Sequence, residues 1–216
     1  SVSVNFLGAF QIKQDLVLIA FPFVISIIIT FSSLILSNRF VLNQVNKPSY
    51  QREIMAPTKD LTFLIADYLI NLFFVAIQVL VLLLVGVFWL GISITKLPLF
   101  LFSIFLASSV LILIGLSLGY LIKSESISTL FTMFFGMFLF IFSDLLVPSV
   151  LSTPFIRFLI NLSPFVILNS SLWDVIIVGK DFQGIVFLTF RLSILFIAAM
   201  LIAYLSKKAS KENTLQ

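Results

Sequence analysis

Long runs of apolar residues, separated by short polar stretches, set the pattern of this chain. A helix needs about 20 apolar residues to cross about 30 Å of hydrocarbon. Charge-free runs of that length lie at residues 16–38, 68–95 and 97–122, and the apolar runs at 126–148 and 182–206 each contain a single charged residue. The pattern predicts five transmembrane helices, at residues 16–38, 61–95, 97–122, 126–148 and 182–206.

The stretch between the fourth and fifth predicted helices, residues 147–179, is apolar but broken. It carries Pro148, Pro154, Pro164, Arg157 and Asp174. Proline removes a backbone donor that lipid cannot replace, and neither unbroken piece is long enough for a comfortable crossing. We expect one or two short helices that dip into the outer leaflet and return, as an external hairpin over 147–181. The alternative is a full sixth crossing at 155–178, which would move the C-terminus to the opposite side.

Lysine and arginine in the connecting segments predict the orientation, because they favour the cytoplasmic side. With five crossings, one side receives Arg39, Lys47, Arg52, Lys59, Lys123, Lys207, Lys208 and Lys211, and the other receives Lys13, Lys96, Arg157 and Lys180. We therefore expect a multi-pass protein of the cell membrane with a cytoplasmic C-terminus and a short frayed tail at 207–216. With this orientation, Ser1 would lie on the outer side of the membrane. A further helix upstream of Ser1 would explain this location.

Composition narrows the class of function. Hydrophobic residues make up 61% of the chain and charged residues 10%, whereas soluble domains are about a quarter charged. Cysteine and histidine are absent, which removes thiolate chemistry, nearly every zinc site and the usual general base near neutral pH. We expect no enzyme activity, no cofactor and no metal on this chain. The net charge of +4 is dispersed, so no nucleic-acid partner is expected.

The longest polar stretch, residues 38–60, lies between the first two predicted helices on the cytoplasmic side. Apolar residues are spread among its charges, so a short helix could lie at the membrane interface. Two interpretations stay open. The stretch is a basic loop that follows the positive-inside rule, or it is a coupling element that docks on a soluble partner.

The order of these features resembles the permeases of ABC-2 type exporters over nearly the whole chain. Those permeases have a cytoplasmic segment with an Arg/Glu-rich start and a later proline, matched here by Arg52, Glu53 and Pro57. They also have a proline-bearing bend after the fifth helix, a second proline, an apolar helix, Asn/Ser-Pro, and a glycine before the last helix. The matching positions here are Ser143, Pro148, Pro154, residues 161–164 and Gly179. The chain departs from the pattern at Asp144, where glycine is common, and at Trp173 and Asp174, where an arginine is often found.

The resemblance implies a permease subunit of an ATP-driven exporter, in one transmembrane domain spanning 1–216. It implies a homodimer or heterodimer of such halves, surrounded by membrane lipid, with two separate ATP-binding subunits beneath it. ATP would bind those partners, since this chain has no G-x-x-x-x-G-K-[ST] run. By this analogy the 38–60 segment seats in the ATPase, with the coupling residues Arg52, Glu53, Met55, Pro57 and Lys59. The alternative is a stand-alone channel or an ion-coupled secondary transporter.

Polar residues inside the predicted spans are costly in lipid, so each is a functional candidate. Asp144 and Arg191 are expected at comparable heights, where they form a structural ion pair, contact a substrate or ion, or snorkel to headgroups. Asn71 and Gln78 are seven residues apart and share a helix face, so they line a passage or bond between helices. Asp67 lies near the cytoplasmic end and is interpreted as a boundary residue that water reaches.

Small residues form one further pattern. Gly115 and Gly119 make a G-x-x-x-G pair in the third predicted helix, and this spacing lets two helix backbones approach closely. Packing within the chain is favoured over a contact between subunits.

Overall fold

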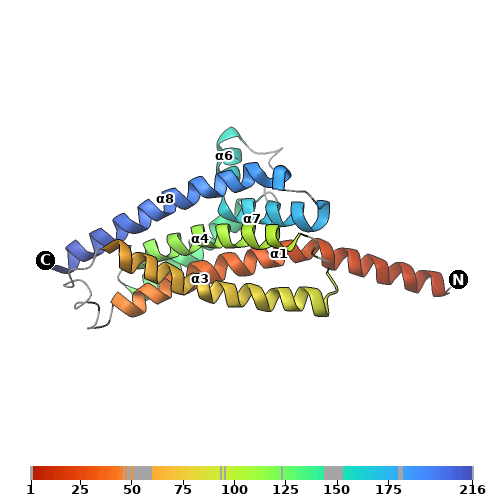
Figure 1. Ribbon diagram of the computed structural model, residues 1–216, viewed down its shortest axis with the longest axis horizontal. Helices are drawn as coiled ribbons and strands as arrows, with labels where there is room; N and C mark the ends of the chain where they lie inside the picture. Colours follow the sequence, from red (N-terminus) through yellow and green to blue (C-terminus); the bar gives the residue numbers. More distant parts are fainter. Residues whose placement is uncertain are drawn as a thin grey trace.

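Helices account for nearly all of the computed structural model (Figure 1). The structure describes residues 2–45, 47, 50, 60–92, 94, 96–122, 124–143, 153–179 and 182–215, and their side chains except those of 2–16, 18, 60, 182 and 213–215. Over these ranges there is no β-strand. The predicted all-α fold is confirmed.

The described residues form five long helices that extend along the molecule, and two short helices lie between the fourth and the fifth of these. The long helices are α1 (Val2–Val45), α3 (Asp60–Leu84), α4 (Leu97–Leu121), α5 (Glu125–Ile141) and α8 (Phe182–Leu215). The short helices are α6 (Pro154–Leu162) and α7 (Pro164–Trp173). Two π-helical turns, η1 (Val85–Trp89) and η2 (Asp174–Val178), continue α3 and α7.

Four of the helices are long and apolar enough to cross a membrane: α1 from Ile19 onward, α3 with η1, α4 and α8. The pair formed by α6 and by α7 with η2 gives a fifth if the bent pair is one span. α5 has 17 residues, which extend about 26 Å at about 1.5 Å per residue. It is shorter than the helix predicted at 126–148, of which residues 144–148 lie outside the described part.

α4 is the central helix of the bundle. It packs against α1, α3, α5, α7 and α8, and 67% of its apolar stretch is buried, compared with 17% for α3 and for α8. Its glycine pair brings it against α1. A Cβ atom on Gly115 would lie 2.6 Å from the carbonyl oxygen of Leu34, and one on Gly119 would lie 2.9 Å from the Cβ of Val41. The prediction that this pair serves packing within the chain is confirmed.

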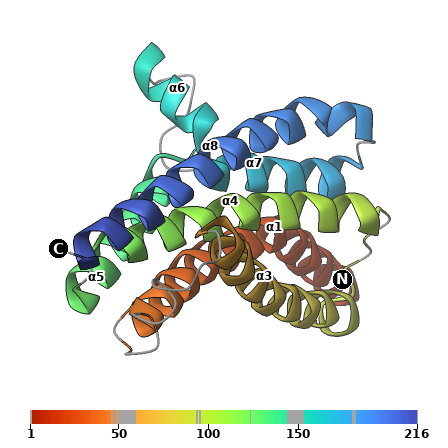
Figure 2. The same cartoon turned by 60° about the vertical axis from the view of Figure 1, so that its left-hand side comes forward.

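Prolines begin both short helices. Pro154 and Pro164 occupy the first turn of α6 and α7, where a missing N–H leaves no helical bond unmade. The axes of α6 and of α7 with η2 differ by 71°, and α6 stands away from the other helices (Figure 2). Two short helices are present, as predicted, and their dip into the outer leaflet and return stays a prediction.

The positions of the helix ends show how often the chain passes from one end of the bundle to the other between α4 and α8. α5 begins at the C-terminal end of α4, where Ser128 bonds to Asn38 of α1. Gly179, after η2, lies at the N-terminal end of α4, where its carbonyl oxygen accepts a hydrogen bond from the Lys96 ammonium group. The chain from α5 to η2 therefore passes from one end of the bundle to the other once. A crossing at 155–178 in addition to one by α5 would return Gly179 to the first end, and whether the bent pair is a broken span or a re-entrant loop stays a prediction.

Two helices extend beyond the apolar runs that predicted them. α1 covers Val2–Val45 and not only residues 16–38, and α8 covers Phe182–Leu215 and not only residues 182–206. The prediction of a frayed tail from Lys207 is wrong over the described residues. An apolar run marks where hydrocarbon ends, and a helical backbone can continue past that point.

Candidate functional site

The predicted coupling residues, Arg52, Glu53, Met55, Pro57 and Lys59, lie outside the described residues. The elements around them are described. Residues 38–45 of the predicted 38–60 segment belong to α1, Tyr50 is buried, and α3 begins at Asp60. The segment therefore joins the end of α1 to the start of α3 at one end of the bundle.

A buried carboxylate joins four helices at this end. Asp67 of α3 and Lys207 of α8 are each only 5% exposed, and the Lys207 Nζ lies 3.3 Å from the Asp67 Oδ2. The Tyr120 hydroxyl of α4 donates a hydrogen bond to the same oxygen at 2.5 Å. The Gln44 Nε2 of α1 donates to the Asp67 Oδ1 at 3.1 Å. We call these four residues the Asp67 cluster.

Aromatic rings cover the Lys207 ammonium group. Its Nζ lies 5.3 Å from the ring centroid of Phe63 and 5.3 Å from that of Tyr120. A ring face attracts a cation, and both rings help to keep water from the salt bridge. The interpretation of Asp67 as a boundary residue that water reaches is therefore wrong.

Sequence reasoning missed this cluster because Asp67 and Lys207 are 140 residues apart. The signal that could have found it is modest. An acidic residue near the start of one predicted span and a lysine just after the end of another fall on the same predicted side of the membrane.

A second polar cluster joins α1 to α5 near the same end. The Asn38 Nδ2 donates hydrogen bonds to the Ser128 carbonyl oxygen at 3.0 Å and to the Thr132 Oγ1. The Ser128 Oγ donates to the Asn38 Oδ1 at 3.0 Å. All three residues are buried. Because every partner here is a neutral side chain or a backbone group, the arrangement holds the two helices together without a buried charge.

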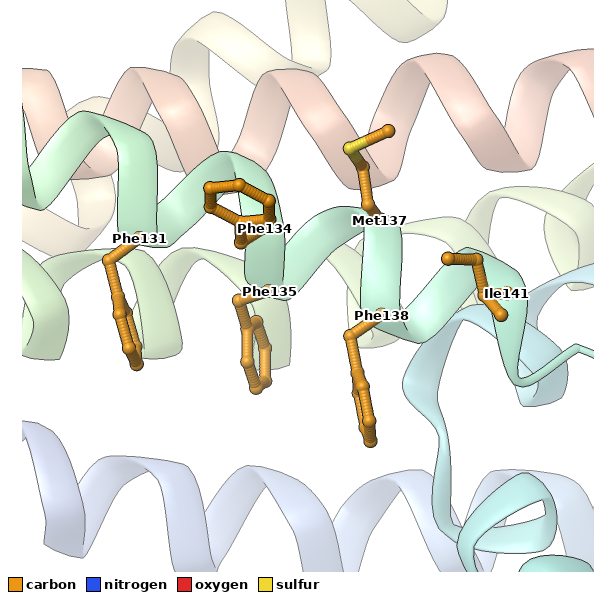
Figure 3. A pocket seen from close by; sticks show the side chains of 6 residues that line it. All are labelled: Phe131, Phe134, Phe135, Met137, Phe138 and Ile141. Carbon is orange, nitrogen blue, oxygen red and sulfur yellow. The ribbon is translucent and has the colours of Figure 1, made fainter.

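An apolar groove follows the exposed side of α5. It encloses about 610 Å³ and is lined by Phe131, Phe134, Phe135, Met137, Phe138 and Ile141. Figure 3 shows Phe131, Phe135 and Phe138 pointing to one side of α5 and Met137 pointing to the other. Phe134 is 68% exposed. A face this apolar requires lipid, another protein chain or an apolar ligand beside it.

A family model described as ABC-2 type transporter matches residues 3–177. The chain belongs to the ABC-2 type transporter family. The resemblance found in the sequence is thereby confirmed, and no curated protein matches the sequence. As a membrane subunit of this family, the ABC-2 type transporter described here is a multi-pass permease of ABC-type transport.

Three of the four polar residues predicted inside the spans of this ABC-2 type transporter are described, Asn71 and Gln78 on α3 and Arg191 on α8. Asn71 is fully buried, and its Nδ2 donates to the Asp67 carbonyl oxygen at 2.8 Å within α3. Gln78 is half-buried, on the same helix.

Arg191, the cation expected to pair with Asp144, lies over an aromatic ring of its own helix. Its guanidinium carbon is 4.2 Å from the ring centroid of Phe187, one turn earlier in α8. Asp144 lies outside the described residues, so the ion pair expected between it and Arg191 stays a prediction.

Proposed function

We propose that this permease is the membrane-spanning subunit of an ATP-driven exporter, and that it couples to separate ATPase subunits through the 38–60 segment. One observation carries the proposal. The salt bridge between Lys207 and Asp67 brings the C-terminal part of α8 to the end of the bundle where the 38–60 segment joins α1 to α3. A soluble partner at that end would touch the segment and the C-terminus together.

Positive charge supports a cytoplasmic location for this end. Arg39, Lys47 and Lys208 are exposed there, and lysine and arginine are enriched in cytoplasmic segments. We therefore place the C-terminus, the 38–60 segment and the ATPase subunits in the cytoplasm.

A second permease half, of the same or a different sequence, would complete the pathway for the transported molecule. We propose that the second half lies beside the α5 groove, because the groove combines a concave shape with an entirely apolar lining. A molecule that passes between the two halves would then meet phenylalanine side chains, which favour apolar or amphipathic cargo through burial of apolar surface.

The coupling assignment is tested with the permease co-expressed with an ATP-binding subunit and reconstituted in lipid nanodiscs. We expect Arg52→Ala, Glu53→Ala and Pro57→Ala each to lower the ATPase rate of the complex at least about fivefold, the low end of typical coupling between linked sites. Lys47→Ala is the matched control, since Lys47 is an exposed residue of the same segment outside the predicted set.

If none of the three substitutions changes the ATPase rate of the complex, the coupling role of the segment is contradicted. Transport that continues in vesicles without any ATPase subunit would instead support a channel or a secondary transporter.

A further inference from the structure

We propose that Asp67 is a positioning residue, through which a movement of the 38–60 segment is passed to α1, α4 and α8. The inference rests on the coupling role proposed for that segment. It assigns a specific event to the bundle: the salt bridge between Asp67 and Lys207 is closed in one state of the transport cycle and open in the other.

Of the two helices that the segment joins, α3 is the one with less of its apolar stretch buried. It begins at Asp60, and Asp67 lies about 10 Å further along at about 1.5 Å per residue. Only 17% of the apolar stretch of α3 is buried, so packing holds it less firmly than α4. Besides Asp67, the Tyr68 hydroxyl ties it to α4, at 2.7 Å from the Ser109 Oγ.

The partners of Asp67 lie where movement would be passed on. Gln44 is part of the 38–60 segment and stands one residue before the end of α1. Tyr120 stands one residue before the end of α4. Lys207 belongs to the part of α8 that continues beyond its apolar run. A shift of the Asp67 carboxylate therefore acts on three other helices at once.

The bundle has a firmly packed pair against which α3 and α8 could move. α4 meets α1 closely at Gly115 and Gly119, where an added Cβ atom would lie 2.6 Å from the Leu34 carbonyl oxygen and 2.9 Å from the Val41 Cβ. α3 and α8 are joined to each other by the salt bridge between Asp67 and Lys207 and by the ring contact between Tyr68 and Phe196, whose centroids lie 6.2 Å apart. A lysine has four rotatable bonds and can change partners, so the salt bridge can open while the contact between α1 and α4 stays closed.

A pair of introduced cysteines tests the inference. Asp67→Cys with Lys207→Cys supplies the only thiols of the permease, because the natural chain has no cysteine. The variant is assembled with a cysteine-free ATPase partner in nanodiscs and treated with a short, reducible thiol cross-linker. We expect the cross-linking yield to differ at least about fivefold between the nucleotide-free complex and the complex trapped with ATP and vanadate. We also expect bridging to lower the ATPase rate by a similar factor, and reduction to restore it.

The two single-cysteine variants are the matched controls, because the same reagent should leave the ATPase rate of each at the value that it has before treatment. The charge-swapped variant Asp67→Lys with Lys207→Asp provides a second measurement if the cysteine pair does not fold. It should hydrolyse ATP at a rate near that of the wild type, whereas Asp67→Asn alone should not.

Equal cross-linking in both states, with an unchanged ATPase rate after bridging, would overturn the role of Asp67 and leave the proposed function standing. A wild-type permease that neither binds an ATPase subunit nor alters its rate would overturn the proposed function, and this inference with it.

Discussion

Lys207 of α8 forms a buried salt bridge to α3. Its ammonium group is buried, lies 3.3 Å from the Asp67 Oδ2 and is covered by two aromatic rings. A buried ion pair adds little stability compared with apolar packing, but removal of one partner leaves an uncompensated charge. The cluster therefore affects stability mainly when it is broken.

We expect Lys207→Met to destabilise the purified protein by about 3–5 kcal/mol, because the Asp67 carboxylate is left buried without a counter-charge. The measurement is thermal unfolding in detergent, followed by tryptophan fluorescence. Lys208→Met is the matched control, since Lys208 is exposed, and we expect a change within about 0.5 kcal/mol. An equal loss of stability in the two variants would show that the salt bridge does not stabilise the end of the bundle that carries the Asp67 cluster.

At the residue scale, the sequence predicted contacts between small residues better than contacts between charges. The spacing of Gly115 and Gly119 alone indicates a close helix approach, and the structure supplies the partner. Asp67 has no comparable local signal. Its burial depends on Tyr120 and Lys207, which follow it by 53 and 140 residues, so only the fold brings them together.

At the element scale, the sequence predicted helices well where a charge or a proline marks the end. α4 occupies Leu97–Leu121, against a prediction of 97–122, because Pro98 lies in its first turn and Lys123 follows its apolar run. α1 and α8 extend further than predicted, because no helix-breaking residue follows their apolar runs at once. The π-helical turns η1 and η2 have no signal in the hydrophobic pattern.

α5 presents its phenylalanines outward, and this gives a prediction about one helix face. We expect Phe134→Ala to lower the ATPase rate of the assembled complex several-fold, because the groove would lose contact with the second half or with the cargo. Phe73→Ala on α3 is the matched control, because Phe73 is 65% exposed and Phe134 is 68% exposed.

Both substitutions remove a similar apolar surface from an exposed site, so their effects on thermal unfolding should be alike. A difference in ATPase rate would then come from what lies beside α5. Equal ATPase rates in the two variants would contradict the assignment of the α5 groove to the pathway.

At the scale of the whole molecule, the arrangement of ends gives a labelling prediction. Lys47 and Lys208 lie at the end that carries the Asp67 cluster, whereas Lys96 lies at the other end, beside Gly179. Single cysteines at Lys47 and Lys208 should react with a membrane-impermeant maleimide from the same face, and a cysteine at Lys96 from the opposite face. The absence of natural cysteine keeps the background low. Labelling of Lys47→Cys and Lys208→Cys from opposite faces would contradict the arrangement.

The bend between α6 and α7 has a consequence for the surrounding bilayer. The last carbonyl groups of a helix lack helical partners, and Pro164, at the start of α7, has no N–H to offer those of α6. Hydrocarbon cannot satisfy such groups, so we expect water or lipid headgroups to reach the level of the bend beside this face. We therefore expect the membrane to be thinnest next to α6, where a lipid or an amphipathic molecule would find the shortest way between leaflet and water.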